Sequence, residues 1–90
     1  MTGAEHMLRV KQCRCVICWY KLGVIITPCD AHHVGTGLER NDFATAALCK
    51  THHQGADGVH GLQRRGFERM WKVTPILLLA WTNMELARNA

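Results

Sequence analysis

The chain lacks a hydrophobic run long enough to cross a membrane. Its longest strongly apolar stretch covers residues 76–81, far short of the roughly 20 residues that span a bilayer. Residues 1–12 also lack the apolar stretch of about 7–15 residues that marks a secretory signal. We therefore expect no membrane partner and a cytoplasmic, reducing environment. Clustered cysteines in such an environment are more often metal ligands than disulfides.

Aromatic residues are also scarce, at 7% of the chain, and there is no internal repeat or low-complexity linker. A chain of 90 residues forms one small domain and buries only about 60% of its unfolded surface. Such a domain usually needs a supplement to its core. Five cysteines and six histidines indicate that the supplement is metal. We expect residues 1–12 to be a polar lead-in and residues 13–90 to be a single domain.

The chain has no large excess of either positive or negative charge, so its composition does not predict a disordered protein. Charged residues make up 20% of the chain and are interspersed, with a net charge of +4, which fits a nucleic-acid partner without proving one. A helix is expected over residues 62–72, and we take its basic residues as candidates for binding a nucleic-acid backbone: Arg64, Arg65, Arg69 and Lys72. For any one of them, a solvated helix face is an equally good interpretation.

The hydrophobic pattern predicts an α+β domain. A β-branched run predicts a strand over residues 21–27; after Pro28 the chain resumes as an extended segment over 29–34, and a second strand covers 43–48. Glycines predict a loop over 35–42. Thr74 and Pro75 have the cap and first-turn residue types of a last helix. We expect the apolar stripe of that helix to pack on the preceding one, through Ile76, Leu77, Ala80 and Trp81 against Phe67, Met70 and Trp71.

Two pairs of residues have the spacing of metal ligands. Cys15 and Cys18 form the first pair, and Cys49 and His52 form the second. Together they complete a tetrahedral Cys3His set, which is typical of structural zinc. The alternative is that these cysteines are small buried hydrophobes, but two correctly spaced pairs rarely arise by chance. Cys13 is an alternative to Cys15 as a ligand, through a wider turn, but the spacing favours Cys15, and we expect Cys13 and Cys29 not to be ligands.

Four further histidines are left within residues 13–90 after the zinc ligands are assigned to this set. His32 and His33 precede the second strand, His53 directly follows His52, and His60 lies in a glycine-rich segment. A hairpin between the two ligand pairs would bring them together as a second, open metal site; the alternative is surface histidines in turns. Because successive strand residues point to opposite faces, His32 and His33 can share one centre only if the backbone is irregular there.

The order of these motifs resembles the HNH endonuclease superfamily, which has a ββα-metal fold. The segments CDAHHVGTG (residues 29–37) and LCKTHHQGADGVHGLQRRGFERMW (residues 48–71) are similar to small phage-encoded HNH nucleases, in particular the recombination enhancement, RecA-dependent nuclease family. The resemblance implies DNA as partner, in the cytoplasm of a bacterial host. A RecA-type recombinase is the weaker expectation, since family members that depend on RecA have a longer N-terminal region.

The resemblance also implies roles for individual residues. His32 and His53 match ligands of a catalytic divalent ion (Mg²⁺ or Mn²⁺, with Zn²⁺ as the alternative), His60 matches a third histidine of that site, and His33 matches the general base. The zinc set matches the family's structural site. Asn41 and its neighbour Asp42 lie earlier than the family's central asparagine relative to Cys49, so the role of orienting the loop stays unassigned.

These residue types suit phosphodiester hydrolysis. A neutral imidazole can take a proton from water at working pH, and a divalent ion with few protein ligands keeps positions open for substrate. We therefore expect a metal-dependent endonuclease of little sequence specificity. The alternative hypothesis is a zinc-stabilised DNA-binding module without activity. A third hypothesis is a protein-interaction domain in which the histidines are structural.

Overall fold

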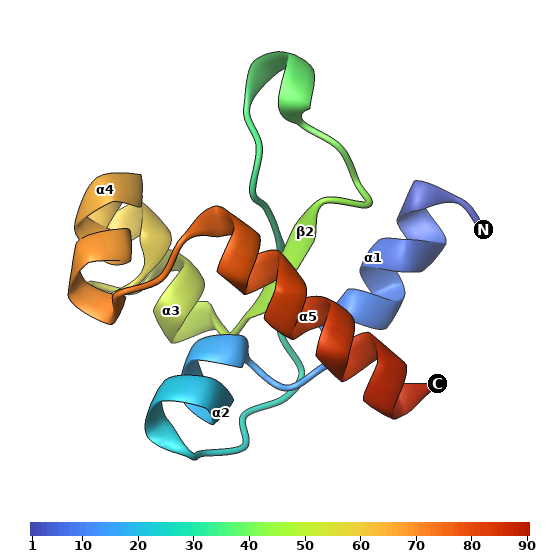
Figure 1. The fold of residues 1–90 in the computed structure, drawn as a ribbon, viewed down its shortest axis with the longest axis horizontal. Helices are drawn as coiled ribbons and strands as arrows, with labels where there is room; N and C mark the ends of the chain where they lie inside the picture. Colours follow the sequence, from blue (N-terminus) through green and yellow to red (C-terminus); the bar gives the residue numbers. More distant parts are fainter.

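The computed structural model describes all 90 residues and has an α+β fold. Its elements follow in the order α1 (Gly3–Lys11), α2 (Val16–Leu22), β1 (Asp30–His33), the 3₁₀ turn η1 (Gly37–Glu39), β2 (Thr45–Leu48), α3 (Lys50–Gln54), α4 (Val59–Trp71) and α5 (Pro75–Asn89). The helices surround one small hairpin, with α1 and α3 near opposite ends of it and α5 running across it (Figure 1). None of the helices is long and apolar enough to span a bilayer.

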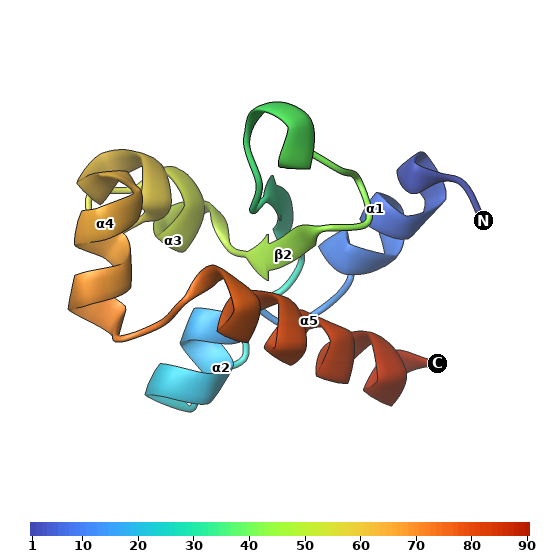
Figure 2. The same cartoon turned by 45° about the horizontal axis from the view of Figure 1, so that its top comes forward.

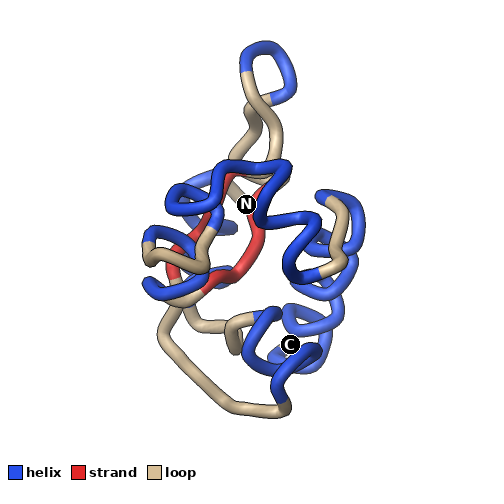
Figure 3. Tube along the Cα trace, turned by 90° about the vertical axis from the view of Figure 1, so that its left-hand side faces the viewer, coloured by secondary structure: helices blue, strands red, loops and turns tan.

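The sheet is a single antiparallel hairpin of β1 and β2. Its register pairs Asp30 with Leu48 and His33 with Thr45, so most of the extended segment expected over 29–34 and most of the strand expected over 43–48 are confirmed. The residues between the strands form a long loop that contains η1 and projects from the body of the protein (Figure 3). This hairpin places the two consecutive histidines at the end of β1.

The strand expected over residues 21–27 is wrong. Lys21 and Leu22 end helix α2, and Gly23 follows in the left-handed conformation, with φ 68°, which glycine adopts without steric cost. The β-branched residues after it are exposed and have no strand partner, because β2 pairs only with β1. Local β propensity is overridden where no neighbouring strand accepts the hydrogen bonds.

Helix α1 occupies most of residues 1–12, the expected polar lead-in. Thr2 and Glu5 form a reciprocal capping box: the Thr2 N–H donates to Glu5 Oε1 (2.8 Å) and the Glu5 N–H donates to Thr2 Oγ1 (3.1 Å). This Thr-x-x-Glu spacing is a sequence signal for a helix start, and it could have revealed α1. The helix packs on both strands and fully buries Val10.

Helix α5 begins at the expected cap, where Thr74 Oγ1 accepts from the Leu77 N–H (3.1 Å). The expected packing of its apolar stripe on α4 is wrong. The helix packs mainly on β2, α1 and α2 instead, as Figure 2 shows. Trp81 stacks on Tyr20 of α2 with ring centroids 4.8 Å apart, whereas Met70 of α4 is half exposed. The turn after Trp71 leads the chain away from α4, since Lys72 adopts a left-handed conformation, with φ 53°.

The core is unusually rich in cysteine. All five cysteines are among its fifteen buried residues, and two more are alanines. Phe67 is the only aromatic residue of the core, and the remaining members are valines, isoleucine and leucines. Short side chains of this kind bury little apolar surface, so the hydrophobic effect alone gives this domain modest stabilisation.

Candidate metal centres

Three cysteines and one histidine converge in the core. The Sγ atoms of Cys18 and Cys49 are 3.8 Å apart, and His52 Nδ1 lies 3.7, 3.4 and 3.3 Å from the Sγ atoms of Cys15, Cys18 and Cys49. A tetrahedral zinc ion with bonds of about 2.3 Å to sulfur and about 2.0 Å to nitrogen spaces its ligands by roughly 3.5–3.8 Å. These four side chains therefore fit one zinc ion, as the ligand spacing predicts.

The two halves of this Cys3His cluster are built in the same way. Cys15 is the N-cap of α2 and Cys49 is the N-cap of α3, and each partner follows three residues later in the first turn. That spacing is close to one helical turn, so the two side chains of each pair face the same side. Helix N-termini also favour negative charge, which suits thiolate ligands.

The cluster is closed to solvent. Its four residues are at most 6% exposed, and the His52 ring meets Trp71 edge-on at 5.0 Å. A hydrogen bond from Cys29 is the main cause that lowers the pKa of the Cys15 thiol to about 4, whereas burial raises the pKa of Cys18 and of Cys49. A closed set of four soft donors is typical of a structural site.

Cys13 and Cys29 are buried but do not belong to the set of four. The Cys13 Sγ donates to the Arg9 carbonyl (3.5 Å), and the Cys29 Sγ lies 3.7 Å from the Ile26 carbonyl oxygen. Cys15 rather than Cys13 is therefore the member of the cluster, in agreement with the preferred interpretation of the sequence.

A second cluster consists of His32, His53 and His60. Their nearest ring nitrogens all lie within 4.8 Å of one another, and the Nε2 atoms of His53 and His60 are 3.2 Å apart. His32 and His53 are half-buried and His60 is exposed. Three imidazoles with one open side resemble a catalytic rather than a structural metal site, because the remaining positions stay free for other ligands.

Local backbone features bring His60 beside His53. The glycine-rich segment allows the start of α4 to pack tightly on α3: a Cβ atom on Gly61 would lie 2.1 Å from the Gly55 carbonyl oxygen. Helix α4 is then interrupted at Gln63, which has φ 64° and ψ 162°. The first turn of α4, which carries His60, can therefore point in a direction of its own.

The surroundings of His53 and His32 leave each ring with a nitrogen lone pair for a metal ion: a hydrogen bond fixes the tautomer of His53, and burial keeps His32 neutral. The His53 Nδ1 lies 2.9 Å from Asp30 Oδ2, so Nδ1 carries the proton and Nε2 faces the cluster. Metal-binding histidines commonly have such a carboxylate partner. Burial is the main cause that lowers the pKa of His32 to about 4, with His53 and His60 adding to the shift, and this keeps the His32 imidazole neutral.

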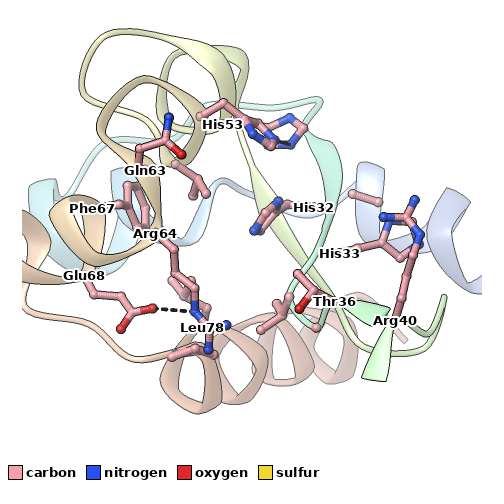
Figure 4. Close-up of a pocket in the computed structure, with 16 residues that line it drawn as sticks. His32, His33, Thr36, Arg40, His53, Gln63, Arg64, Phe67, Glu68 and Leu78 are labelled. Atoms are coloured by element: carbon pink, nitrogen blue, oxygen red, sulfur yellow. Dashed lines mark hydrogen bonds and ion pairs between the residues drawn. The ribbon is translucent and has the colours of Figure 1, made fainter. Parts of the chain in front are cut away.

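The cluster opens onto a cavity of about 440 Å³ whose apolar lining includes Phe67 and Leu78. Figure 4 shows His32 in its middle, His53 above, and His33 at the side with Arg40. His33 borders the cavity but is not part of the cluster; its Nε2 lies 2.9 Å from Asp42 Oδ1 instead. The irregular backbone expected at His32 and His33 is wrong, because both pair in register with β2.

Of the four basic candidates, only Arg64 borders the cavity. Its Nε donates to Glu68 (2.9 Å), which leaves its Nη groups available. The other three are exposed on α4 or at its end: Arg65, Arg69 and Lys72. Sequence reasoning missed Arg40 as a cavity residue and missed the pairing of Asp30 and Asp42 with histidines. The resemblance drew attention to Asp42 only as the neighbour of Asn41, and no motif distinguishes Arg40 or Asp30 in the sequence.

Comparison with protein-family models, with curated proteins and with solved structures found no match to this chain.

Proposed function

We propose that the chain is a metal-dependent endonuclease of the HNH type, which hydrolyses DNA phosphodiester bonds with little sequence specificity. One observation carries the proposal: the open cluster of three histidines lies on a cavity that a further histidine, His33, and two arginines also border. A closed Cys3His cluster in the core supports it, because it leaves the histidines free for a role other than folding.

The donor set of the open cluster fits a divalent transition metal. Imidazole nitrogens suit ions such as Zn²⁺, whereas Mg²⁺ prefers oxygen ligands. His32, His53 and His60 would hold the ion, and Zn²⁺ or Mn²⁺ is favoured over Mg²⁺. Such an ion would polarise a phosphodiester and stabilise charge on its leaving oxygen.

The cavity also offers groups for the substrate itself. Arg40 and Arg64 border it, and the free Nη groups of Arg64 can donate to phosphate oxygens. Contacts to phosphate carry no sequence information, so binding should be independent of sequence and sensitive to salt.

His33 is the proposed general base. It takes a proton from a water molecule, whose oxygen then attacks phosphorus while the bond to the 3′ oxygen breaks. The side chain of His33 is 17% exposed, so water can reach it, and it borders the same cavity as the three metal-binding histidines. General base catalysis of this kind contributes about 10²–10⁴-fold to rates.

A plasmid assay tests the proposal. Supercoiled DNA is incubated with zinc-loaded protein and with added Mn²⁺, Zn²⁺ or Mg²⁺, using the wild type and the variants His33→Ala and His53→Ala. His6→Phe is the matched control, because His6 lies outside both clusters and its ring packs on Phe43. We expect nicking that both active-site variants lose and the control keeps, while His33→Ala still binds DNA.

Other outcomes decide against the proposal. Equal activity of the wild type and His33→Ala would indicate a contaminant or a different base. A folded, zinc-loaded wild type that binds DNA but does not cleave it with any of these ions would favour the zinc-stabilised DNA-binding module.

A further inference from the structure

We infer that Asp42 is a positioning residue for His33: it holds the ring so that Nδ1 is the nitrogen that accepts the proton from water. The inference rests on the proposed function, in which His33 is the general base. Asp42 touches no residue of the metal clusters through a hydrogen bond, so its effect on cleavage would pass through His33.

The contact between the two side chains is direct. His33 Nε2 lies 2.9 Å from Asp42 Oδ1. A carboxylate can only accept hydrogen bonds, so the neutral imidazole must carry its proton on Nε2, and the lone pair on Nδ1 stays free. The second partner of a histidine ring decides in this way which nitrogen is available for chemistry.

The two histidine–aspartate pairs of the protein select opposite tautomers. Asp30 accepts from Nδ1 of His53 and leaves Nε2 for the metal cluster, whereas Asp42 accepts from Nε2 of His33 and leaves Nδ1. His33 is thereby kept as a separate base at the rim of the cavity rather than as a fourth metal ligand.

The backbone around Asp42 is fixed on both sides. The Asn41 Oδ1 accepts from the Phe43 N–H (2.8 Å), and the Thr45 hydroxyl donates to the Asp42 carbonyl (3.1 Å). These bonds tie the end of the projecting loop to the start of β2. The carboxylate of Asp42 is therefore presented to His33 from an ordered turn, although it is 48% exposed.

Helix α1 closes the other side of Asp42. A Cβ atom on Gly3 would lie 2.6 Å from both Cβ and Oδ2 of Asp42, so only glycine allows this approach. The first turn of α1 thus limits where the carboxylate can go, which gives this helix a role at the site.

Steady-state cleavage kinetics test the inference, with variants Asp42→Ala and Asp42→Asn. Glu39→Gln is the matched control, because Glu39 is an exposed acidic residue of the same loop without a side-chain partner. We expect the kcat of both Asp42 variants to fall about 10- to 100-fold, as for a misoriented base. The KM for DNA, the metal content and the melting temperature should stay unchanged, and the control should match the wild type.

A double-mutant cycle separates positioning from a purely structural role. If Asp42 acts through His33, Asp42→Ala has no further effect on the residual activity of His33→Ala. Additive losses in the double variant, or a kcat within twofold of the wild type in both Asp42 variants, would overturn the inference.

Nitrogen-15 NMR of the histidine rings tests the tautomer without any need for activity. We expect neutral His33 to carry its proton on Nε2 in the wild type, and Asp42→Asn to introduce the Nδ1-protonated form, because its amide can also donate. A wild-type His33 protonated on Nδ1 overturns the inference even if DNA is cleaved. A wild type that never cleaves DNA overturns the proposed function, whereas the NMR result still decides the ring assignment.

Discussion

Removal of zinc from the Cys3His cluster should unfold the domain. The binding free energy at structural zinc sites is about 10–16 kcal/mol near neutral pH, whereas whole domains are stable by only about 5–15 kcal/mol. Here five of the fifteen core residues are cysteines, so little apolar packing remains to compensate. Loss of zinc therefore removes about as much free energy as the folded state has in total.

The variant Cys49→Ser makes this prediction specific. It removes one ligand and leaves His52, which is 6% exposed, without a metal partner, at a further cost of about 1–3 kcal/mol for a buried unsatisfied group. We expect this variant to lack helical circular dichroism and a cooperative melting transition. Cys13→Ala is the matched control, because Cys13 is fully buried but is no member of the cluster, and its Sγ donates to the Arg9 carbonyl instead; it should stay folded and keep its zinc.

A chelator titration followed by circular dichroism and by a colorimetric zinc reagent provides the assay. Any zinc on the exposed three-histidine cluster should leave first, without a change in helicity. Zinc from the buried cluster should leave later, together with the loss of structure. Metal-free protein that keeps the wild-type spectrum and melts cooperatively would refute the reasoning.

Three further predictions concern single side chains. Asp30→Asn should weaken metal binding at the open cluster about 10- to 100-fold, the usual effect of losing a carboxylate behind a histidine ligand, and calorimetric metal titration measures it. Arg64→Gln should lower the slope of log affinity for DNA against log salt by about one, and fluorescence anisotropy over a salt series would show no change if Arg64 misses phosphate. Glu85→Gln should destabilise the fold by about 2 kcal/mol in urea denaturation, since Glu85 is 1% exposed and accepts two hydrogen bonds from Arg14. Hydrogen bonds from Arg14 lower the pKa of Glu85 below 4.5. The stabilisation by Glu85 is therefore complete above pH 4.5 and is lost as the pH falls through the folded pKa. A stability difference between wild type and Glu85→Gln that varies between pH 6 and 8 would contradict the assignment.

The four ligands of the Cys3His cluster could be predicted from the sequence because the geometry of each pair is local. Cys15 with Cys18, and Cys49 with His52, are three residues apart, and one helical turn brings each pair together wherever the helices lie. The cap at Thr74 is local in the same sense. The Thr2–Glu5 capping box of α1 is equally local. Helix α1 could therefore have been predicted from the sequence as well.

Only the tertiary structure decided which long-range partners each residue meets. The run over residues 21–27 has strand propensity but no neighbouring strand, and α5 packs across the hairpin and α2 instead of α4. The pairing of Asp30 with His53 and of Asp42 with His33 likewise joins segments that no local pattern connects. Spacing along the chain determines which side chains share a helical turn, whereas packing determines what those side chains face. The ligands of both clusters could therefore be predicted from the sequence, whereas only the fold decided that His33 lies outside the open cluster and pairs with Asp42.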